Sequence, residues 1–254
     1  MSQDSGLQPL PTPAEGSTHF KLYKSPNPSW KFGQTIQGTA EGKKWMEGTK
    51  GADAWKVVDP KLEEPRKLYG LLLSGIGPRP IALVSSISAA GVENLAPFSW
   101  FNQVCSDPPT ISVAVTAVAA NKFKDTASNV KATRQFTVSI ISEPWVEQAN
   151  SCSVDAPPNI SEWDVSGLTK VASTLVKPAR VLESAFSMEC ELLQAVDIPH
   201  LPKEHVRKDM LNDRGVCDMS KLQVVGRIFG IAYSRLTEGY EMERPRWQDV
   251  EGKY

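Results

Sequence analysis

The chain has 254 residues, of which 41% are hydrophobic and 22% are charged, a composition typical of a globular protein with a core of ordinary size. This length suits one large β domain with extensions, or two small domains. The formal net charge is −1 and no long block of like charge occurs, which argues against a general role in binding nucleic acid or a membrane surface.

Residues 1–65 have the composition of an extension, with many Pro, Gly, Ser and charged residues and no strand or helix periodicity. The segment nevertheless contains Trp30, Phe32, Trp45 and Trp55. A disordered tail seldom carries four such large aromatic residues. We therefore predict an N-terminal arm that is ordered over residues 20–60 and packs on the rest of the chain or on a partner subunit.

The body of the chain is predicted to be a domain over residues 66–240, followed by a tail over 241–254. Alternating or continuous apolar runs predict strands at 80–87, 92–101, 110–118, 135–142, 186–196 and 222–234. Helical spacing or a helix-opening proline predicts helices at 68–73, 122–134 and from 144 onward. Turn signals lie at 89–91 and 107–109, and 157–169 has the composition of a loop. A polar stretch over 200–220 separates the last two predicted strands. Several strands with few helices predict an antiparallel barrel.

The common catalytic and phosphate-binding motifs are absent, since the chain has no GxGxxG, GxxxxGK[ST], HExxH or GxSxG sequence. The histidines at 19, 200 and 205 do not have the spacing of a metal site, and no two of the four cysteines form a CxxC pair. We expect no metal and reduced thiols, and if the chain is an enzyme, an organic cofactor carries its chemistry. No apolar run is long enough to cross a bilayer. The first residues do not form a basic and then apolar segment, so no signal peptide and a cytoplasmic location are expected.

Four segments occur in an order that is specific to one protein family. They are GPRPIALVSS at 77–86, GVENLAPFSWFN at 91–102, SDPP at 106–109, and KDT at 124–126 followed by Asn129. Together they resemble the flavin reductase-like, FMN-binding split-barrel family over residues 66–240. SEW at 161–163, SGLT at 166–169, WKFGQ at 30–34 and TEGY at 237–240 are similar to its larger, fungal-type members. The resemblance implies a mainly β fold with a few helices, an FMN-binding split β-barrel that is antiparallel and Greek-key-like.

The resemblance also implies a set of cofactor-binding residues, namely Arg79, Ser85, Ser86, Ala96, Pro97, Phe98, Ser99, Trp100, Phe101, Asn102, Asn121, Lys124, Asp125 and Thr126. A helix N-terminus with Lys124 and the Thr126 hydroxyl suits the FMN phosphate, and Asp125 is expected to cap the helix. His205 is the candidate proton donor.

Each of these assignments has a structural alternative. The segment at 124–126 is also compatible with an ordinary capped surface helix, and 94–102 with an edge strand that places Phe98 and Phe101 in the core. Arg79 is equally compatible with a structural salt bridge, the serines with strand-end capping, and His205 with a partly exposed loop.

The expected function is that of an FMN-dependent oxidoreductase, in which NADH or NADPH reduces the bound flavin and electrons pass to flavin, oxygen or a small organic acceptor. Two alternatives stay open: a specialised biosynthetic flavoenzyme that reduces one ene, quinone or aromatic substrate, and a non-enzymatic FMN-binding electron carrier. A homodimer with FMN at the subunit interface is expected, because a split barrel alone leaves one face of a flat cofactor open to water. No nucleic-acid or membrane partner is expected.

Overall fold

A computed structural model describes residues 26–116, 123–196, 204–227, 233–236 and 238–251. The chain forms two compact units. In their described parts, the first unit contains residues 26–78 and those between 204 and 239, and the second contains residues 79–196 and 240–251. The sheets of both units are antiparallel, which confirms the predicted mainly β, antiparallel architecture with a few helices.

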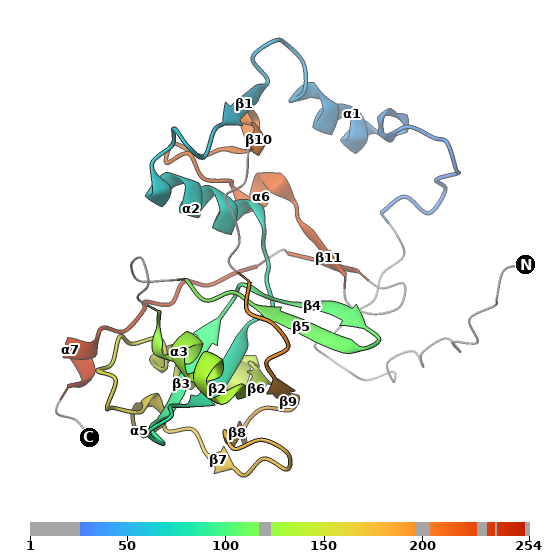
Figure 1. Cartoon of the computed structure of the whole chain (residues 1–254). Coiled ribbons are helices and arrows are strands. Elements are labelled where there is room, and N and C mark those ends of the chain that lie inside the picture. Colours follow the sequence, from blue (N-terminus) through green and yellow to red (C-terminus); the bar gives the residue numbers. More distant parts are fainter. Residues whose placement is uncertain (1–25, 117–122, 197–203, 228–232, 237, 252–254) are drawn as a thin grey trace, which may run out of the picture. The chain divides into compact units, whose positions relative to one another are not determined.

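The second unit is built on a four-stranded antiparallel sheet with the strand order β3-β2-β6-β9 (Figure 1). Its strands are β2 (Ala82–Ile87), β3 (Glu93–Phe98), β6 (Gln135–Ile140) and β9 (Ser187–Glu191). Around them lie β4 (Phe101–Ser106), β5 (Pro109–Val113), α3 (Asp125–Thr133), η2 (Glu143–Trp145), α4 (Val146–Ser151), α5 (Glu162–Ser166), β7 (Lys170–Val171), β8 (Arg180–Val181) and α7 (Trp247–Val250).

Both faces of this sheet are covered, which explains why β2 is buried along almost its whole length. Successive side chains of a strand point to opposite faces. Ala82 and Val84 accordingly pack in one core cluster with Phe101 of the β4–β5 hairpin, and Leu83 packs in a second cluster with Trp145 beside α4. The prediction of a strand at 80–87 buried on both faces is confirmed.

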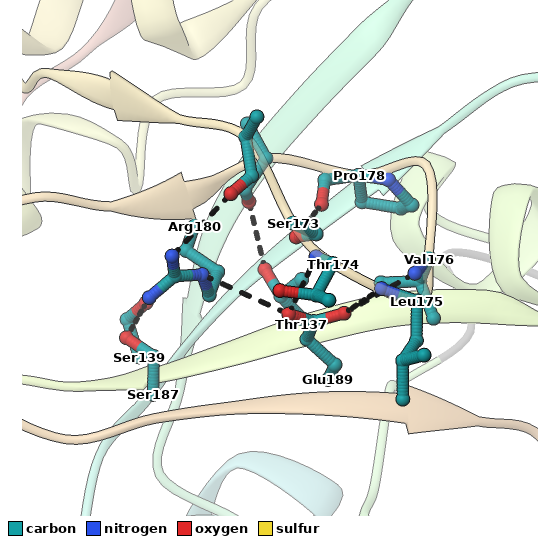
Figure 2. A network of polar contacts seen from close by, with 12 residues as sticks. Thr137, Ser139, Ser173, Thr174, Leu175, Val176, Pro178, Arg180, Ser187 and Glu189 are labelled. Carbon is teal, nitrogen blue, oxygen red and sulfur yellow. Dashed lines mark hydrogen bonds and ion pairs between the residues drawn. The ribbon is translucent and has the colours of Figure 1, made fainter.

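A carboxylate on β9 holds the loop between β7 and β8 (Figure 2). Glu189 accepts hydrogen bonds from the backbone N–H groups of Thr174, Leu175 and Val176, and it lies 3.9 Å from the Arg180 Nε. The N–H hydrogen bonds hold the pKa of the Glu189 carboxyl below its usual value. A charged acceptor therefore organises a loop that has no regular secondary structure of its own.

The first unit contains most of the predicted arm together with a segment from the C-terminal third of the chain. Its elements are η1 (Ile36–Gly38), α1 (Ala40–Glu47), β1 (Trp55–Val58), α2 (Pro65–Gly75), β10 (Glu204–Arg207), η3 (Lys208–Met210), α6 (Met219–Leu222), β11 (Val225–Arg227) and β12 (Tyr233–Arg235). β1 pairs with β10, and the Trp45 ring of α1 lies 4.8 Å from the Arg207 guanidinium carbon. Arg207 is buried and donates two hydrogen bonds to Asp209.

The arm is thus structured where it is described, although Trp30, Phe32 and Trp55 remain about half or more exposed within one chain. Residues 20–25 of the predicted ordered segment lie outside the described residues. The two units also differ from the predicted boundaries 1–65, 66–240 and 241–254. The reason is that β1–β10 pairing joins the arm to residues after 203, and Asn150 and Asp155 of the second unit bond residues 243 and 244 of the predicted tail.

Three sequence-based expectations were wrong in detail. Residues 1–65 were predicted to lack regular structure, yet they contain α1 and β1. Residues 157–169 were predicted to be a loop, yet they contain α5, which begins after a Ser161 cap and ends at Gly167 with φ 68°. Residues 222–234 were predicted to be one strand, yet β11 and β12 are two paired strands. Each of these elements has eight residues or fewer, too few for periodicity to be read reliably.

Two further properties bear on function. All four cysteines are free of disulfide bonds, with only Cys105 exposed. In the part of the chain that the structure describes, no helix has the length and apolar character needed to cross a membrane.

Candidate functional site at the start of helix α3

The N-terminus of α3 concentrates positive potential at one point of the second unit. Lys124 is the N-cap residue, and the first backbone hydrogen bond of the helix runs from the Ser128 N–H to the Lys124 carbonyl at 3.1 Å. The N–H groups of the first helical residues have no partner within the helix, and they carry its positive dipole end. Lys124 is half-buried and forms no ion pair with any described residue. The helix start therefore offers backbone donors and a full positive charge.

The structure corrects the role expected of Asp125. Lys124 occupies the N-cap position in extended conformation, with φ −68° and ψ 156°, and Asp125 is the first helical residue. A carboxylate in the first turn still interacts favourably with the helix dipole, so Asp125 stabilises the helix without capping it. The predicted helix at 122–134 is confirmed where it is described, since α3 covers Asp125–Thr133.

A buried polar cluster fixes the first turns of α3 against the sheet. The Asn94 side-chain amide donates to the Thr126 hydroxyl at 2.9 Å and to the Ser86 hydroxyl at 3.4 Å. The Asn129 amide donates to the same Ser86 oxygen at 3.2 Å. All four side chains are buried. We call Ser86, Asn94, Thr126 and Asn129 the asparagine cluster, and it ties β2, β3 and α3 together.

A cavity of about 90 Å³ opens beside the asparagine cluster. The lining residues are Ser88, Val92, Glu93, Asn94, Asp125, Asn129, Pro158 and Ile160. Cavities that enclose an organic ligand usually measure about 300–1,000 Å³. This cavity is therefore much too small for a whole flavin, although it marks a polar hollow at the helix start.

A second group of the predicted residues lies where β3 turns into β4. The Arg79 Nε donates to the Ser99 hydroxyl at 3.4 Å, so the structure brings these two predicted residues together. Phe98 and Phe101 pack in the core cluster under the hairpin, whereas Trp100 is 39% exposed. Phe101 is buried in this cluster and Phe98 is partly buried against it, as the alternative that places both phenylalanines in the core expects.

Along the rest of this segment, Ala96 and Pro97 lie on β3 and are half-buried, and Asn102 lies on β4 and is exposed. The segment from Ala96 to Asn102 thus presents backbone, an indole ring and small polar groups at the surface of the second unit.

The two predicted serines of β2 do not share a surface. Ser86 belongs to the asparagine cluster, and Ser85, its neighbour on the strand, points to the opposite face of the sheet. The Ser85 hydroxyl is buried and has no hydrogen-bond partner among the described residues. Ser85 is therefore separated from the helix start that Ser86 supports.

Two predicted residues remain, His205 and Asn121. His205 lies in β10 of the first unit, where its backbone pairs with Val57. Asn121 lies outside the described residues.

A buried carboxyl group lies on α5 at the edge of the sheet. The Glu162 Oε2 accepts a hydrogen bond from the Leu95 N–H at 3.0 Å, and the side chain is 6% exposed. Burial raises the pKa of Glu162 to about 7, and the nearby Asp125 carboxylate adds to the increase. Burial also raises the pKa of the Cys152 thiol to about 12, with a further contribution from Glu162. At neutral pH Glu162 is thus a mixture of its neutral and charged forms.

Comparison with known proteins identifies the family. A family model described as a flavin reductase like domain matches residues 75–202, which is half of the chain. The chain belongs to the flavin reductase-like family. Its predicted split-barrel fold is confirmed, and the match contains all the predicted cofactor-binding residues but not His205. Membership of this family makes the chain a flavin-linked oxidoreductase.

Bacterial relatives cover most of the chain. An uncharacterized protein of Halalkalibacterium halodurans is 32% identical over 74% of this chain and 96% of its own length. The uncharacterized protein YwrF of Bacillus subtilis is 31% identical over 70% of this chain and 93% of its own length. The crystal structure of nitrilotriacetate monooxygenase component B from Bacillus cereus superposes with a TM-score of 0.55 and 31% identity, covering 73% of this chain and 97% of that chain.

The donor set at the helix start fits a phosphate group. The hydroxyl oxygens of Ser86 and Thr126 already accept hydrogen bonds from side-chain amides. The groups that remain, which are the hydroxyl hydrogens and the free N–H groups of the first helical turn, are all hydrogen-bond donors. A phosphate is an acceptor-only dianion, and Lys124 supplies the opposite charge. The FMN phosphate is therefore compatible with the residues present.

Asn94, Asn129 and Glu162 are site residues that reasoning from the sequence did not select. Both asparagines stand inside the segments that carry the family resemblance, so a signal for them was present. Glu162 also stands in such a segment, SEW at 161–163, but its contact with a strand 67 positions away in the chain could not be predicted from a local pattern.

Proposed function

We propose that the protein is an FMN-dependent oxidoreductase that takes electrons from NADH or NADPH and passes them to flavin or a small organic acceptor. The observation that carries this proposal is the start of α3, where a half-buried lysine without an ion pair among the described residues meets the free amides of the helix. In a flavin reductase-like chain, this arrangement supports a phosphate-bearing flavin, and we propose that this flavin is FMN.

The residues of the second unit divide the work of binding between two ends. Lys124 and the first amides of α3 hold the phosphate, while the asparagine cluster keeps them in place. Arg79 and Ser99, together with the exposed Trp100, bind the ring end. Bound FMN supplies a reversible acceptor for a hydride, and the chain supplies position, charge and exclusion of water.

A homodimer with the flavin at its interface is part of this proposal. The cavity at the helix start is too small to enclose a ring system, and Trp100 leaves aromatic surface uncovered. In the first unit, Trp30, Phe32 and Trp55 are likewise exposed. A second copy of the chain related by a twofold axis is the commonest way in which such surfaces are covered. We expect an apolar interface of more than the standard ~1,600 Å².

The Bacillus cereus relative bears on the choice of acceptor. Its name makes it one component of a monooxygenase. This name favours free flavin as the electron acceptor of our protein, with the reduced flavin passing to a separate oxygenase. Two rival functions are a biosynthetic enzyme with one specific substrate and a non-enzymatic carrier. They differ from the proposed oxidoreductase in whether NAD(P)H reduces the bound flavin.

Anaerobic titration of the purified holoprotein with NADH and then NADPH tests the proposal. We expect rapid loss of the visible absorbance of the flavin with one of the two nucleotides and its return on adding free flavin. No bleaching with either nucleotide would favour the carrier or the specialised enzyme. A colourless protein that takes up no added FMN would reject the proposal outright. Light scattering at micromolar concentration tests the dimer, which a monomer that still holds FMN would rule out.

A further inference from the structure

The cavity beside the asparagine cluster has charges of only one sign in its lining. Glu93 of β3 and Asp125 of α3 contribute two carboxylates, and the described lining residues include no lysine, arginine or histidine. Lys170, which is not among them, bonds Glu93. No described residue forms an ion pair with Asp125. Charges are screened poorly in a narrow hollow, so this lining attracts a positive ion.

Two buried asparagines add neutral oxygen atoms to the same lining. Asn94 and Asn129 both line the cavity, and each is only 7% exposed. Their Nδ2 groups donate to the Ser86 and Thr126 hydroxyls, which belong to residues outside the lining. The oxygen of a side-chain amide lies on the other branch from its nitrogen, so Oδ1 is the polar atom that each asparagine has left for the cavity. No described residue donates a hydrogen bond to either Oδ1.

A positive ion in this cavity would satisfy all of these oxygen atoms together. A buried carbonyl oxygen without a partner is costly, and so are two carboxylates on one small cavity. A water molecule could donate to the oxygens, but it would leave the two negative charges in place.

We propose that the cavity binds a hard divalent cation of the class of Ca²⁺ and Mg²⁺, with the Glu93 and Asp125 carboxylates and the two asparagine Oδ1 atoms as its ligands. These ions take carboxylate, amide and water oxygens, whereas zinc and softer metals prefer nitrogen and sulfur. The described residues contain no group of three or more His, Cys, Asp and Glu side chains that could hold a metal, so neutral oxygens complete the coordination. A volume of about 90 Å³ also leaves room for water, which occupies about 30 Å³ per molecule in the liquid.

The cation would join two elements that the asparagine cluster already connects. Its ligands come from β3 and from the first two turns of α3. Lys124 is not among the lining residues, so the phosphate contact proposed above lies outside the cavity. The inference therefore concerns the apoprotein and does not rest on the proposed function. Because no His or Cys takes part, the spacing of those residues in the sequence could not indicate the site.

Calorimetric titration of the full-length apoprotein with CaCl₂ and MgCl₂ tests the inference, after treatment with a chelator and at constant ionic strength. D125N removes one of the two carboxylates and keeps the size of the side chain. D164N removes a carboxylate from the exposed surface of α5 and is the matched control, since Asp164 does not line the cavity. E93Q removes the other carboxylate and replaces D125N if that variant does not fold.

We expect the wild type to bind one ion per chain from at least one of the two salts, with a dissociation constant of about 10⁻⁵–10⁻³ M. D125N should bind roughly tenfold more weakly or worse, because it loses a full charge at ligand distance. D164N should stay within about twofold of the wild type, as an exposed charge contributes little. Absence of binding up to about 10 mM of both salts would mean that water fills the cavity, and would overturn the inference. Equal losses in D125N and D164N would show binding to scattered surface carboxylates and would overturn it as well.

A gain of affinity separates a ligand from a merely structural contact. N129D turns one neutral oxygen ligand into a charged one, and the charge of the ligands tunes the affinity of such sites. Without the cation, N129D should melt below the wild type, because a third carboxylate then lines the cavity. With the cation, it should bind roughly tenfold more tightly than the wild type and recover its stability. An N129D protein that folds but binds the ion no more tightly than the wild type would show that Asn129 is not a ligand, and would overturn the site as proposed.

Discussion

Replacing Lys124 by alanine should move stability and flavin binding in opposite directions. An ammonium group at a helix N-terminus faces the positive end of the dipole, which costs about 0.3–1 kcal/mol, and Lys124 has no ion pair among the described residues to offset that cost. Alanine is no worse as a cap, since Lys124 makes no side-chain capping bond. The apoprotein should therefore unfold at the same temperature or a few degrees higher.

The same substitution should weaken FMN binding by about 1.5–3 kcal/mol, the range of a charge-assisted hydrogen bond. This corresponds to roughly a 10- to 150-fold increase in the dissociation constant. Titration of the apoprotein with FMN, followed by flavin fluorescence, measures the change. Riboflavin should bind with nearly unchanged affinity, because it has no phosphate for Lys124 to contact.

Lys131 gives a matched control on the same helix. It lies in the last turn of α3, and its Nζ is 3.6 Å from the centre of the Phe123 ring. Lys131→Ala therefore removes the same charge as Lys124→Ala, but from the opposite end of the helix. That variant should lose some stability and keep its FMN affinity. The reasoning is refuted if Lys124→Ala binds FMN as tightly as the wild type, or if it loses FMN and riboflavin affinity by the same factor.

Four other predictions follow from single contacts. Glu162→Gln should leave the free energy of unfolding unchanged below about pH 4.5 and raise it above about pH 7, by at most about 3 kcal/mol relative to the wild type. The reason is that a carboxyl group whose pKa is raised by folding destabilises the folded protein as it ionises with rising pH. Equal urea midpoints at high pH would contradict this. Glu189→Gln should lower the melting temperature at neutral pH, and the difference in melting temperature from the wild type should become smaller in acid. A carboxyl group whose pKa is lowered by folding loses its contribution to the stability of the fold as the pH falls. Trp45→Ala should expose the arm to trypsin by removing the ring that lies over Arg207, and an unchanged cleavage rate would show that α1 is held otherwise. His205→Ala should keep FMN affinity and slow NAD(P)H oxidation by about 10²-fold or more if it is the proton donor, and an unchanged rate would exclude that role.

The parts of the fold that the sequence predicted are those with local signals. The wholly apolar run 80–84 opens β2, and Phe123, Ala127 and Val130 have helical spacing in the region of α3, so both elements were found close to their observed bounds. The strand β1 could not be found in the same way. It has four residues, three of them exposed, and its partner β10 lies about 150 positions later in the chain. Its stability comes from that pairing rather than from its own sequence pattern.

The candidate site likewise contains features that the sequence could predict and features that it could not. Lys124 and Thr126 belong to one short motif, and the structure places both at the start of α3 as expected. Phe98 and Phe101 lie in an equally recognisable motif, yet the Phe101 side chain is buried in the core and the Phe98 side chain packs against it. The motif could not distinguish a ring that faces a ligand from one that supports the strand, because both uses favour an aromatic residue at the same position.

The charges around the helix start show why a phosphate site can tolerate so many carboxylates. Glu93 is paired with Lys170 at the edge of the sheet, and burial raises the pKa of Glu162 to about 7, so that only part of it is charged at neutral pH. Asp125 remains, in the first turn of α3, where the helix dipole stabilises it. The three acidic groups are thus accommodated in three different ways, and the Lys124 charge is left for the ligand.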